Sequence, residues 1–212
     1  MRPLEAAAHH RHLCQMGQGN DSLHAGAGLD LGGKVLVAMP GMGDPRFARS
    51  VILVCAHTPE GAMGLIVNHP ARDADFSELL EHLKIAATSE RRDVRVHLGG
   101  PVERGRGFVL HSRDYSGGAA TMTIPGGLAM TATLDVLEAL AQGRGPDRAL
   151  LALGYAGWGP GQLESEIRRN DWIVAEAPED LLFSADDGGK WAAVLRKAGI
   201  DPVSLSGTAG RA

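Results

Sequence analysis

The chain has 212 residues, a formal net charge of -4 at pH 7, and a composition with 44% hydrophobic but only 4% aromatic residues. A chain of this length can bury one large core, built mainly from aliphatic side chains, and its acidic balance disfavours general attraction to nucleic acid or anionic lipid. No apolar stretch approaches the roughly 20 residues that a membrane-spanning helix needs. Residues 1–28 also lack the apolar segment of a secretory signal, so we expect a cytoplasmic protein without a membrane partner.

The segment before the first apolar run is polar and shows no periodicity. We therefore expect residues 1–28 to form a disordered tail, residues 29–203 one ordered domain, and residues 204–212 a second loose tail. The first tail contains a cluster of histidines that could bind a metal weakly, although such clusters in flexible segments usually have no specific role. Cys14 lies in this polar tail and Cys55 in an apolar run, so we expect no disulfide between them.

The ordered part should begin with a strand over residues 34–39, which Pro40 and Gly41 end. The next apolar run, residues 51–56, is unbroken, which is typical of a strand that is covered on both faces. A four-residue turn with proline and glycine then leads into a strand over residues 62–68. Because the connection is so short, these two strands should form an antiparallel hairpin.

Further along, apolar residues at helical spacing predict three helices, over residues 76–83, 134–140 and 191–198. Short apolar runs predict five more strands, over residues 95–98, 107–112, 121–124, 149–153 and 172–174. The strands do not alternate strictly with helices. This disfavours a doubly wound parallel sheet and favours a mixed α+β layer fold.

Four glycines in eight positions follow the strand at residues 149–153, and Pro160 suits the first turn of a helix after them. Tyr155, Trp158 and Gln162 lie in this stretch, where ligand-facing side chains are often found. The alternative is that the glycines only shape a tight turn and that Trp158 fills a core. The stretch is neither a phosphate loop nor a dinucleotide-binding fingerprint, because the required spacings are missing.

Four segments of the chain form a pattern when they are taken together. The first is Ala38-Met39-Pro40-Gly41-Met42-Gly43-Asp44-Pro45-Arg46-Phe47 with Ser50-Val51, and the second is Gly61-Ala62-Met63-Gly64-Leu65-Ile66-Val67-Asn68. The third is Gly99-Gly100-Pro101-Val102 with Arg106-Gly107-Phe108-Val109-Leu110-His111-Ser112, and the fourth is the glycine stretch over residues 154–170. In this order and spacing they resemble the AlgH/YqgE family of small bacterial proteins, over about residues 29–203. The resemblance implies a single α+β domain with a curved mixed sheet flanked by helices. It implies no activity, because the family name comes from a proposed regulatory role in alginate synthesis genes and states no chemistry.

No catalytic motif is complete in the sequence. Cys55 and His57 lie two apart in a strand and should point to the same face, so a cysteine–histidine pair is conceivable, although a buried cysteine near a strand-end histidine is far commoner. His57, His97 and His111 could converge on a metal, but neutral hydrogen-bonded histidines are the commoner case. We expect neither a metal site nor another cofactor.

A more coherent set of residues lies at strand ends and glycine turns, where polar groups converge on clefts. We expect the turn at residues 99–101 and the turn at residues 155–162 to border one cleft, with Arg106 holding a carboxylate or phosphate and His111 exchanging protons. Asp44 and Asn68 could instead bond only their own turns. The candidate ligand-binding residues are Asp44, Asn68, Gly99, Gly100, Arg106, His111, Tyr155, Trp158 and Gln162.

The function that we expect from the sequence is a cytosolic binding or regulatory protein with a small cleft, which recognises a small anionic ligand or a protein partner. The alternative is a hydrolase or transferase with His111 or His57 as its base. A cleft without a base and a nucleophile in reach would favour binding. We do not expect direct DNA binding, because the chain is acidic and has no helix-turn-helix pattern.

Overall fold

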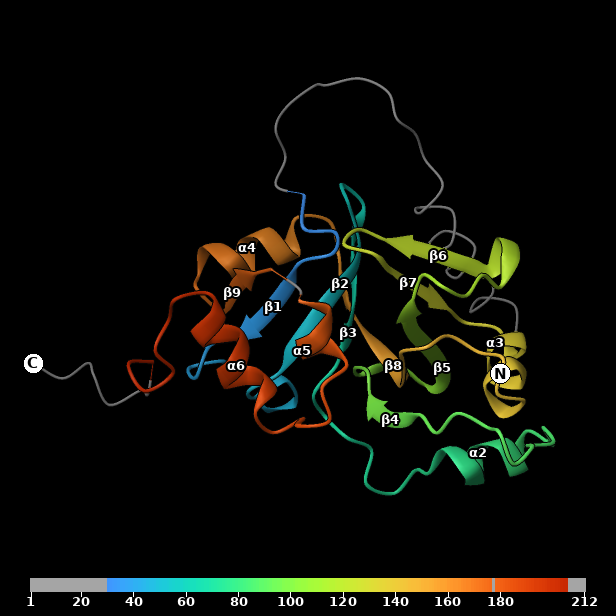
Figure 1. The fold of residues 1–212 in the computed structure, drawn as a ribbon. Coiled ribbons are helices and arrows are strands. Elements are labelled where there is room, and N and C mark those ends of the chain that lie inside the picture. The colour runs from blue at the N-terminus through green and yellow to red at the C-terminus, as the bar shows by residue number, and fades with distance from the viewer. Residues whose placement is uncertain (1–29, 177, 206–212) are drawn as a thin grey trace, which may run out of the picture.

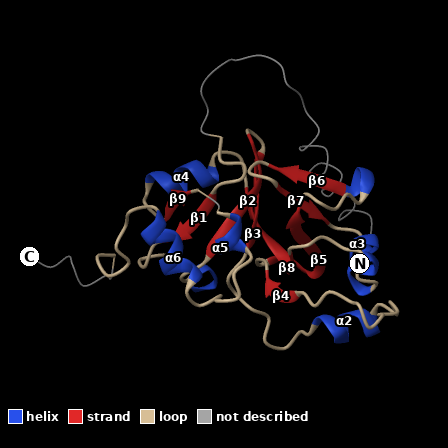
Figure 2. Cartoon of the chain, viewed as in Figure 1, coloured by secondary structure: helices blue, strands red, loops and turns tan. Residues whose placement is uncertain are grey.

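The computed structural model describes residues 30–176 and 178–205, so most of both expected tails lies outside the described residues. Figure 1 shows a curled sheet with helices packed around it, and Figure 2 separates the helices from the strands. The described residues form a single α+β domain, as the sequence predicts. None of its helices is long and apolar enough to cross a membrane.

The first three strands follow the apolar runs of the sequence. β1 (Val35–Ala38), β2 (Val51–Thr58) and β3 (Gly61–Ile66) pair in order and antiparallel. The tight turn between Thr58 and Gly61 makes β2 and β3 a hairpin, so that prediction is confirmed. On its other side β1 pairs antiparallel with the last strand, β9 (Trp172–Ala175), which joins segments far apart in the sequence.

The remaining strands complete a sheet in the order β6-β7-β5-β8-β3-β2-β1-β9. β4 runs parallel to β8, beside the part of β8 that β3 leaves unpaired, and the other pairings are antiparallel. The sheet is therefore mixed, as expected. The bounds of these strands are Arg95–Leu98 for β4, Val102–Ser112 for β5, Thr121–Ile124 for β6, Leu128–Thr131 for β7 and Ala149–Trp158 for β8.

Three strands differ clearly from the prediction. β5 begins at Val102, five residues before the predicted strand over residues 107–112. β8 continues through the first glycines to Trp158. Gly154 allows this because it has a φ of 73°, and a Cβ there would lie 2.6 Å from the backbone oxygen of Val102. The strand β7 was not predicted, because its four residues lie directly beside a pattern that reads as a helix start.

Five α-helices and two short 3-10 helices cover the sheet in the described part of the chain. The α-helices are α2 (Phe76–His82), α3 (Leu134–Ala141), α4 (Gln162–Arg168), α5 (Glu179–Leu182) and α6 (Lys190–Lys197). The 3-10 helices are η1 (Pro45–Phe47) and η2 (Gly118–Ala120). The three helices predicted from apolar spacing correspond to α2, α3 and α6.

Alternation along the strands divides the core between the two faces of the sheet. In β8, Leu150 and Ala152 belong to a first cluster, which α5 and α6 cover with Leu182 and Trp191. Leu151 points to the other face. There α2 and α3 cover one region of the sheet, and α4 packs over another with Leu163, which forms a second cluster beside the two tryptophans Trp158 and Trp172.

Candidate functional site

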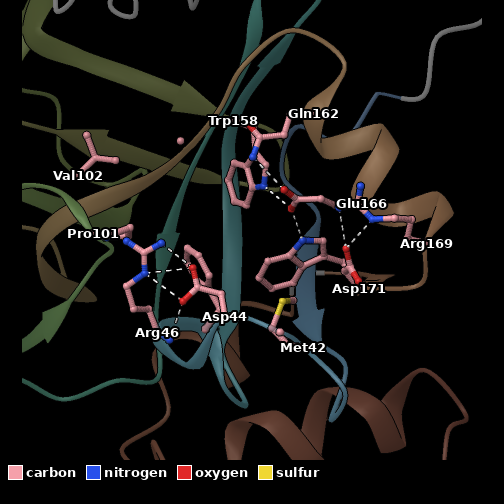
Figure 3. A pocket seen from close by; sticks show the side chains of 14 residues that line it. Met42, Asp44, Arg46, Pro101, Val102, Trp158, Gln162, Glu166, Arg169 and Asp171 are labelled. Carbon is pink, nitrogen blue, oxygen red and sulfur yellow. Dashed lines mark hydrogen bonds and ion pairs between the residues drawn. The ribbon is translucent and has the colours of Figure 1, made fainter.

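A cleft of about 560 Å³ opens between the β1–β2 loop, the helix α4 and the turn that leads into β9 (Figure 3). Segments far apart in the sequence meet here because β1 lies between β2 and β9 in the sheet. The volume falls in the range of small-molecule sites. The lining residues are Met42, Gly43, Asp44, Arg46, Phe47, Pro101, Val102, Gly157, Trp158, Gln162, Glu166, Arg169, Asp171 and Trp172.

The β1–β2 loop forms one wall of the cleft. Asp44 caps η1, because its Oδ1 accepts a hydrogen bond of 3.0 Å from the backbone nitrogen of Arg46. The Arg46 guanidinium also binds both carboxylate oxygens of Asp44, and these contacts hold the pKa of Asp44 below its usual range. Phe47 then packs edge-on against Trp172, with 5.7 Å between the ring centroids. The wall is thus anchored at both its polar and its apolar residues.

The helix α4 and the turn after it form the opposite wall. Gly161, with a φ of 69°, allows the chain to enter the helix, and the Gln162 side chain accepts a hydrogen bond of 3.0 Å from the backbone nitrogen of Gly159. Beyond the helix, Arg169 pairs with Asp171 at 3.0 Å. The two walls therefore each carry one arginine–aspartate pair.

Glu166 of α4 also lines the cleft, and its side chain reaches the two tryptophans (Figure 3). Its Oε2 accepts hydrogen bonds from the indole nitrogens of Trp158, at 2.9 Å, and Trp172, at 2.8 Å. Its Oε1 accepts one from the Gln162 amide at 2.9 Å. Both indole rings are buried, and they meet edge-on at 6.1 Å. The carboxylate is therefore held in one place by three neutral donors.

The structure brings three of the sequence-predicted residues together at this cleft, namely Asp44, Trp158 and Gln162. Gly99 and Gly100 lie beside it, just before Pro101 in the lining. They serve close backbone packing, since a Cβ would lie 2.3 Å from the Gly154 oxygen at Gly99 and 2.1 Å from the Tyr155 carbonyl carbon at Gly100.

Asn68 and Tyr155 do not line the cleft. Asn68 is only 7% exposed, and its amide bonds the backbone of Val51 and Arg49. It therefore joins neighbouring strands rather than only its own turn. Tyr155 is buried in the first cluster, edge-on to Phe108, because β8 continues past the predicted turn.

Arg106 and His111 also lie away from the cleft. Arg106 contacts Glu103 at 3.4 Å, lies 5.1 Å from the Phe108 ring centroid, and borders a separate apolar groove of about 250 Å³. His111 is fully buried, accepts a hydrogen bond from Thr131 and donates one to the Ser112 carbonyl. Burial lowers the pKa of His111. The predicted shared cleft with Arg106 and His111 is therefore not what the structure forms.

The cysteine–histidine pair is ruled out by an irregularity in β2. The register with β3 shifts between Val54 and Ala56, so Cys55 is an extra residue in the strand. Cys55 packs in the first cluster, and burial raises the pKa of its thiol to about 12. His57 lies on the opposite face and binds Glu164 of α4 at 2.9 Å. The expectation that both point to one face was wrong, because strand alternation fails at the bulge.

The three strand histidines do not converge on one point. His57 contacts Glu164, His97 contacts Asp187, and His111 contacts Thr131. Among the residues that the structure describes, no three histidine, cysteine, aspartate or glutamate side chains are grouped as a metal site would require. Each of these histidines therefore serves a separate local network.

Sequence reasoning missed Glu166, which lines the cleft and accepts hydrogen bonds from both tryptophans. The available signal was its spacing four residues after Gln162, which places both side chains on one face of α4. Trp158 and Trp172 flank this helix in the sequence, one before and one after it. Their convergence on Glu166 depends on the pairing of β9 with β1, which local patterns do not reveal.

Comparisons with known proteins point to one family. The AlgH-like family model matches residues 35–203. A UPF0301 protein of Cereibacter sphaeroides is 62% identical over 184 residues, which cover 87% of this chain and 100% of the relative. A UPF0301 protein of Ruegeria pomeroyi is 57% identical over 187 residues, with coverages of 87% and 100%.

Solved structures agree with this match. The solution structure of the AlgH protein of Pseudomonas aeruginosa is similar with a TM-score of 0.70 and 38% identity, and the match covers 90% of this chain and 100% of that one. A crystal structure of a protein from Corynebacterium diphtheriae has a TM-score of 0.65 at 24% identity, with coverages of 85% and 92%, and supports the fold alone.

Proposed function

The chain belongs to the AlgH-like family, and from that premise we propose that it is a binding protein whose cleft takes a guanidinium or ammonium group of a small ligand or of a partner protein. The names of its relatives state no ligand. The class of ligand is therefore argued from the chemistry of the cleft.

The composition of the cleft supports binding over catalysis. Its lining contains no serine, threonine, cysteine, histidine or lysine side chain. The three carboxylates could act as bases, but none lies beside a lining hydroxyl, thiol or amine that it could activate. Since base and nucleophile do not occur together here, the alternative of a hydrolase or transferase finds no support at this site.

Glu166 is the observation that carries the proposal. Its three hydrogen bonds come from neutral donors, and no ion pair within residues 30–176 and 178–205 includes it. A carboxylate offers about four acceptor positions, so Oε1 has room for one more donor. A cationic donor would satisfy that position and balance the charge, and a hydrogen bond between charged groups is worth more than a neutral one.

The arginine pairs on the two walls also favour a cation over the anion that the sequence suggested. The Arg46 side chain is 57% exposed, against 33% for its partner Asp44. Arg169 is 63% exposed, against 30% for Asp171. On both walls the carboxylate is the more enclosed partner, and the lining holds three carboxylates against two guanidinium groups, which favours a cationic ligand. Arg106, which was expected to hold an anion, lies elsewhere.

Calorimetric titration with four probes tests this proposal. N-acetyl-arginine amide and agmatine are the cationic probes, and acetate and inorganic phosphate are the anionic ones. Quenching or enhancement of tryptophan fluorescence gives a second readout, because Trp158 and Trp172 line the cleft. We expect a cationic probe to bind and to change the fluorescence, and the anionic probes to leave both signals unchanged.

The variant Glu166→Gln keeps the shape of the side chain and removes its charge. We expect it to weaken binding of the cationic probe about tenfold or more, since a charged hydrogen bond contributes about 1.5–3 kcal/mol. Glu164→Gln is the matched control on the same helix, because Glu164 contacts His57 and does not line the cleft. Binding of only the anionic probes, or equal affinity in both variants, would contradict the proposal.

A further inference from the structure

A second cluster of charged side chains lies where α6 meets the sheet. Asp187, just before α6, accepts three hydrogen bonds at the single oxygen Oδ1. The donors are Arg95 at 2.9 Å, His97 at 3.0 Å and Lys190 at 2.8 Å. His97 is fully buried and Lys190 is 2% exposed. One carboxylate oxygen therefore joins β4 to the first turn of α6.

The same side chains extend the connection to neighbouring segments. The Lys190 ammonium also donates to the Val67 carbonyl, at 2.7 Å, directly after β3. The Arg95 guanidinium donates to the carbonyls of Phe183 and Ser184, at 2.9 and 2.6 Å, where α5 ends. The cluster thus attaches both C-terminal helices to the sheet, and loss of the carboxylate contact would loosen all of these attachments together.

His97 is the sensitive member of this cluster. Its Nε2 donates to Asp187, and its buried Nδ1 has no hydrogen-bond partner, so the neutral ring fits the site. Protonation would place an N–H at Nδ1 without an acceptor. It would also add a positive charge beside Arg95 and Lys190, with Asp187 as the facing carboxylate and Asp186 farther along the same loop.

The pKa of His97 is lowered from 6.5, with burial as the largest cause, while its contact with Asp187 opposes that shift. A base whose pKa is lowered on folding takes up its proton more readily in the opened state. The neutral His97 ring therefore stabilises the attachment of α6 to the sheet above pH 6.5. This stabilisation is lost as the pH falls from 6.5 towards the lower pKa that His97 has in the folded protein. The pKa of Asp187 is lowered from 3.8, so this carboxylate changes only in more acidic solution.

The helix α6 also supports the wall of the cleft. The Trp191 indole donates to the Ala38 carbonyl at 2.8 Å, at the end of β1. The Arg49 guanidinium lies 5.2 Å from the centroid of the Trp191 ring, and Arg49 follows Phe47 in the β1–β2 loop. Detachment of α6 would therefore remove one contact at the end of β1 and one from the loop that carries Asp44.

We infer that the Asp187 cluster is an acid-sensitive clasp, which opens when His97 is protonated, releases α6 and loosens the cleft wall formed by residues 42–49. The regulation of binding rests on the proposed function of the cleft. The opening of α6 does not, because it concerns contacts on a different side of the sheet. The two ideas can therefore fail separately.

Hydrogen exchange of the full chain, without ligand, tests the clasp at about pH 7.5 and about pH 5.5, after correction for the intrinsic pH dependence of exchange. We expect the opening of α6 amides to increase severalfold, and by at most about tenfold, at the lower pH relative to amides of β2, because one group with a pKa of 6.5 in the opened state can shift the equilibrium by no more than that over this pH step. His97→Gln should abolish most of this response, because glutamine can still donate near Nε2 but does not titrate. An unchanged α6 at both pH values would overturn the inference.

His111→Gln is the matched control, because His111 is also buried with a lowered pKa but contacts Thr131 instead of the cluster. It should keep the α6 response, and loss of that response there would contradict the clasp.

If His97→Gln does not fold, Asp187→Asn provides the second test, and it should open α6 already at about pH 7.5. Hydrogen exchange of the loop 42–49 is also compared at the two pH values. This comparison uses a His69→Gln background, because His69 contacts Ala48 of the loop and its own protonation would add to the response. Opening of α6 with an unchanged loop would overturn the link to the cleft.

Discussion

The Asn68 side chain does not line the cleft, but it holds the end of the β1–β2 loop, which forms one wall of the cleft. Its Oδ1 accepts a hydrogen bond of 2.8 Å from the Val51 backbone, and its Nδ2 donates one of 2.9 Å to the Arg49 carbonyl. Arg49 has a φ of 52°, which a side chain other than glycine adopts only when its surroundings hold it there. The amide therefore fixes the residues that end the β1–β2 loop.

Replacing Asn68 with alanine should destabilise the protein by about 1–3 kcal/mol, because one buried and one partly buried backbone group lose their partner. Urea denaturation measures this as a lower midpoint at an unchanged slope. Asp73→Ala serves as the control, since Asp73 is exposed, and it should leave the midpoint unchanged. A midpoint for Asn68→Ala equal to that of the unmodified protein would show that the amide contributes nothing.

The candidate residues that sequence reasoning placed well are those whose position depends on local structure. Asp44 and Gln162 each begin a short helix, and Trp158 ends a strand. His111 was misplaced because its strand pairs with Ala129 of β7, which the sequence did not reveal. His111 was expected at an exposed strand end, but β5 has a neighbouring strand on each side, β7 and β8, and His111 is buried.

At the scale of elements, the crossing of β8 with the turn before β5 requires glycine at Gly100. A Cβ there would lie 2.1 Å from the Tyr155 carbonyl carbon, which belongs to the backbone and cannot move aside cheaply. At Gly105 in β5, a Cβ would meet nothing within 4 Å. A Cβ atom would therefore clash with the backbone at Gly100 but fit freely at Gly105.

Gly100→Ala should therefore cost about 3 kcal/mol or more in the free energy of unfolding, while Gly105→Ala should stay within about 0.5 kcal/mol of the unmodified protein. Thermal unfolding of both variants gives the comparison. Similar melting temperatures for the two would mean that the close approach of β5 and β8 is not needed for stability.

Element boundaries were predictable where the pattern was unbroken and failed where backbone geometry interrupts it. The run in β2 predicted the strand, but the bulge at Cys55 reversed the side on which His57 lies. The glycines after Leu153 suggested a turn, yet Gly154 only bends β8 and the strand continues. A positive φ at one glycine serves a turn or a bulge equally well, and the sequence does not distinguish them.

At the scale of the molecule, the class of fold followed from the mixture of strands and short helices, whereas the order of strands did not. β9 reaches β1 across most of the chain, and β4 inserts parallel to β8. Both are non-local pairings that no local period encodes. The candidate cleft depends on the first of them, because β9 brings Trp172 and Asp171 opposite the β1–β2 loop.

The last prediction concerns DNA, since the family name comes from a proposed regulatory role. Affinity for DNA needs a concentrated basic face that neutralises phosphates, and this chain has a net charge of -4. Within the described part of the chain, no two helices are joined by the short turn of a helix-turn-helix, and the longest helices have eight residues.

We therefore expect the full chain to bind labelled duplex DNA more weakly than about 1 µM at physiological salt, with any residual binding falling steeply as salt is added. Fluorescence anisotropy with specific and scrambled duplexes measures both properties. Sequence-selective binding at nanomolar concentration would contradict this prediction.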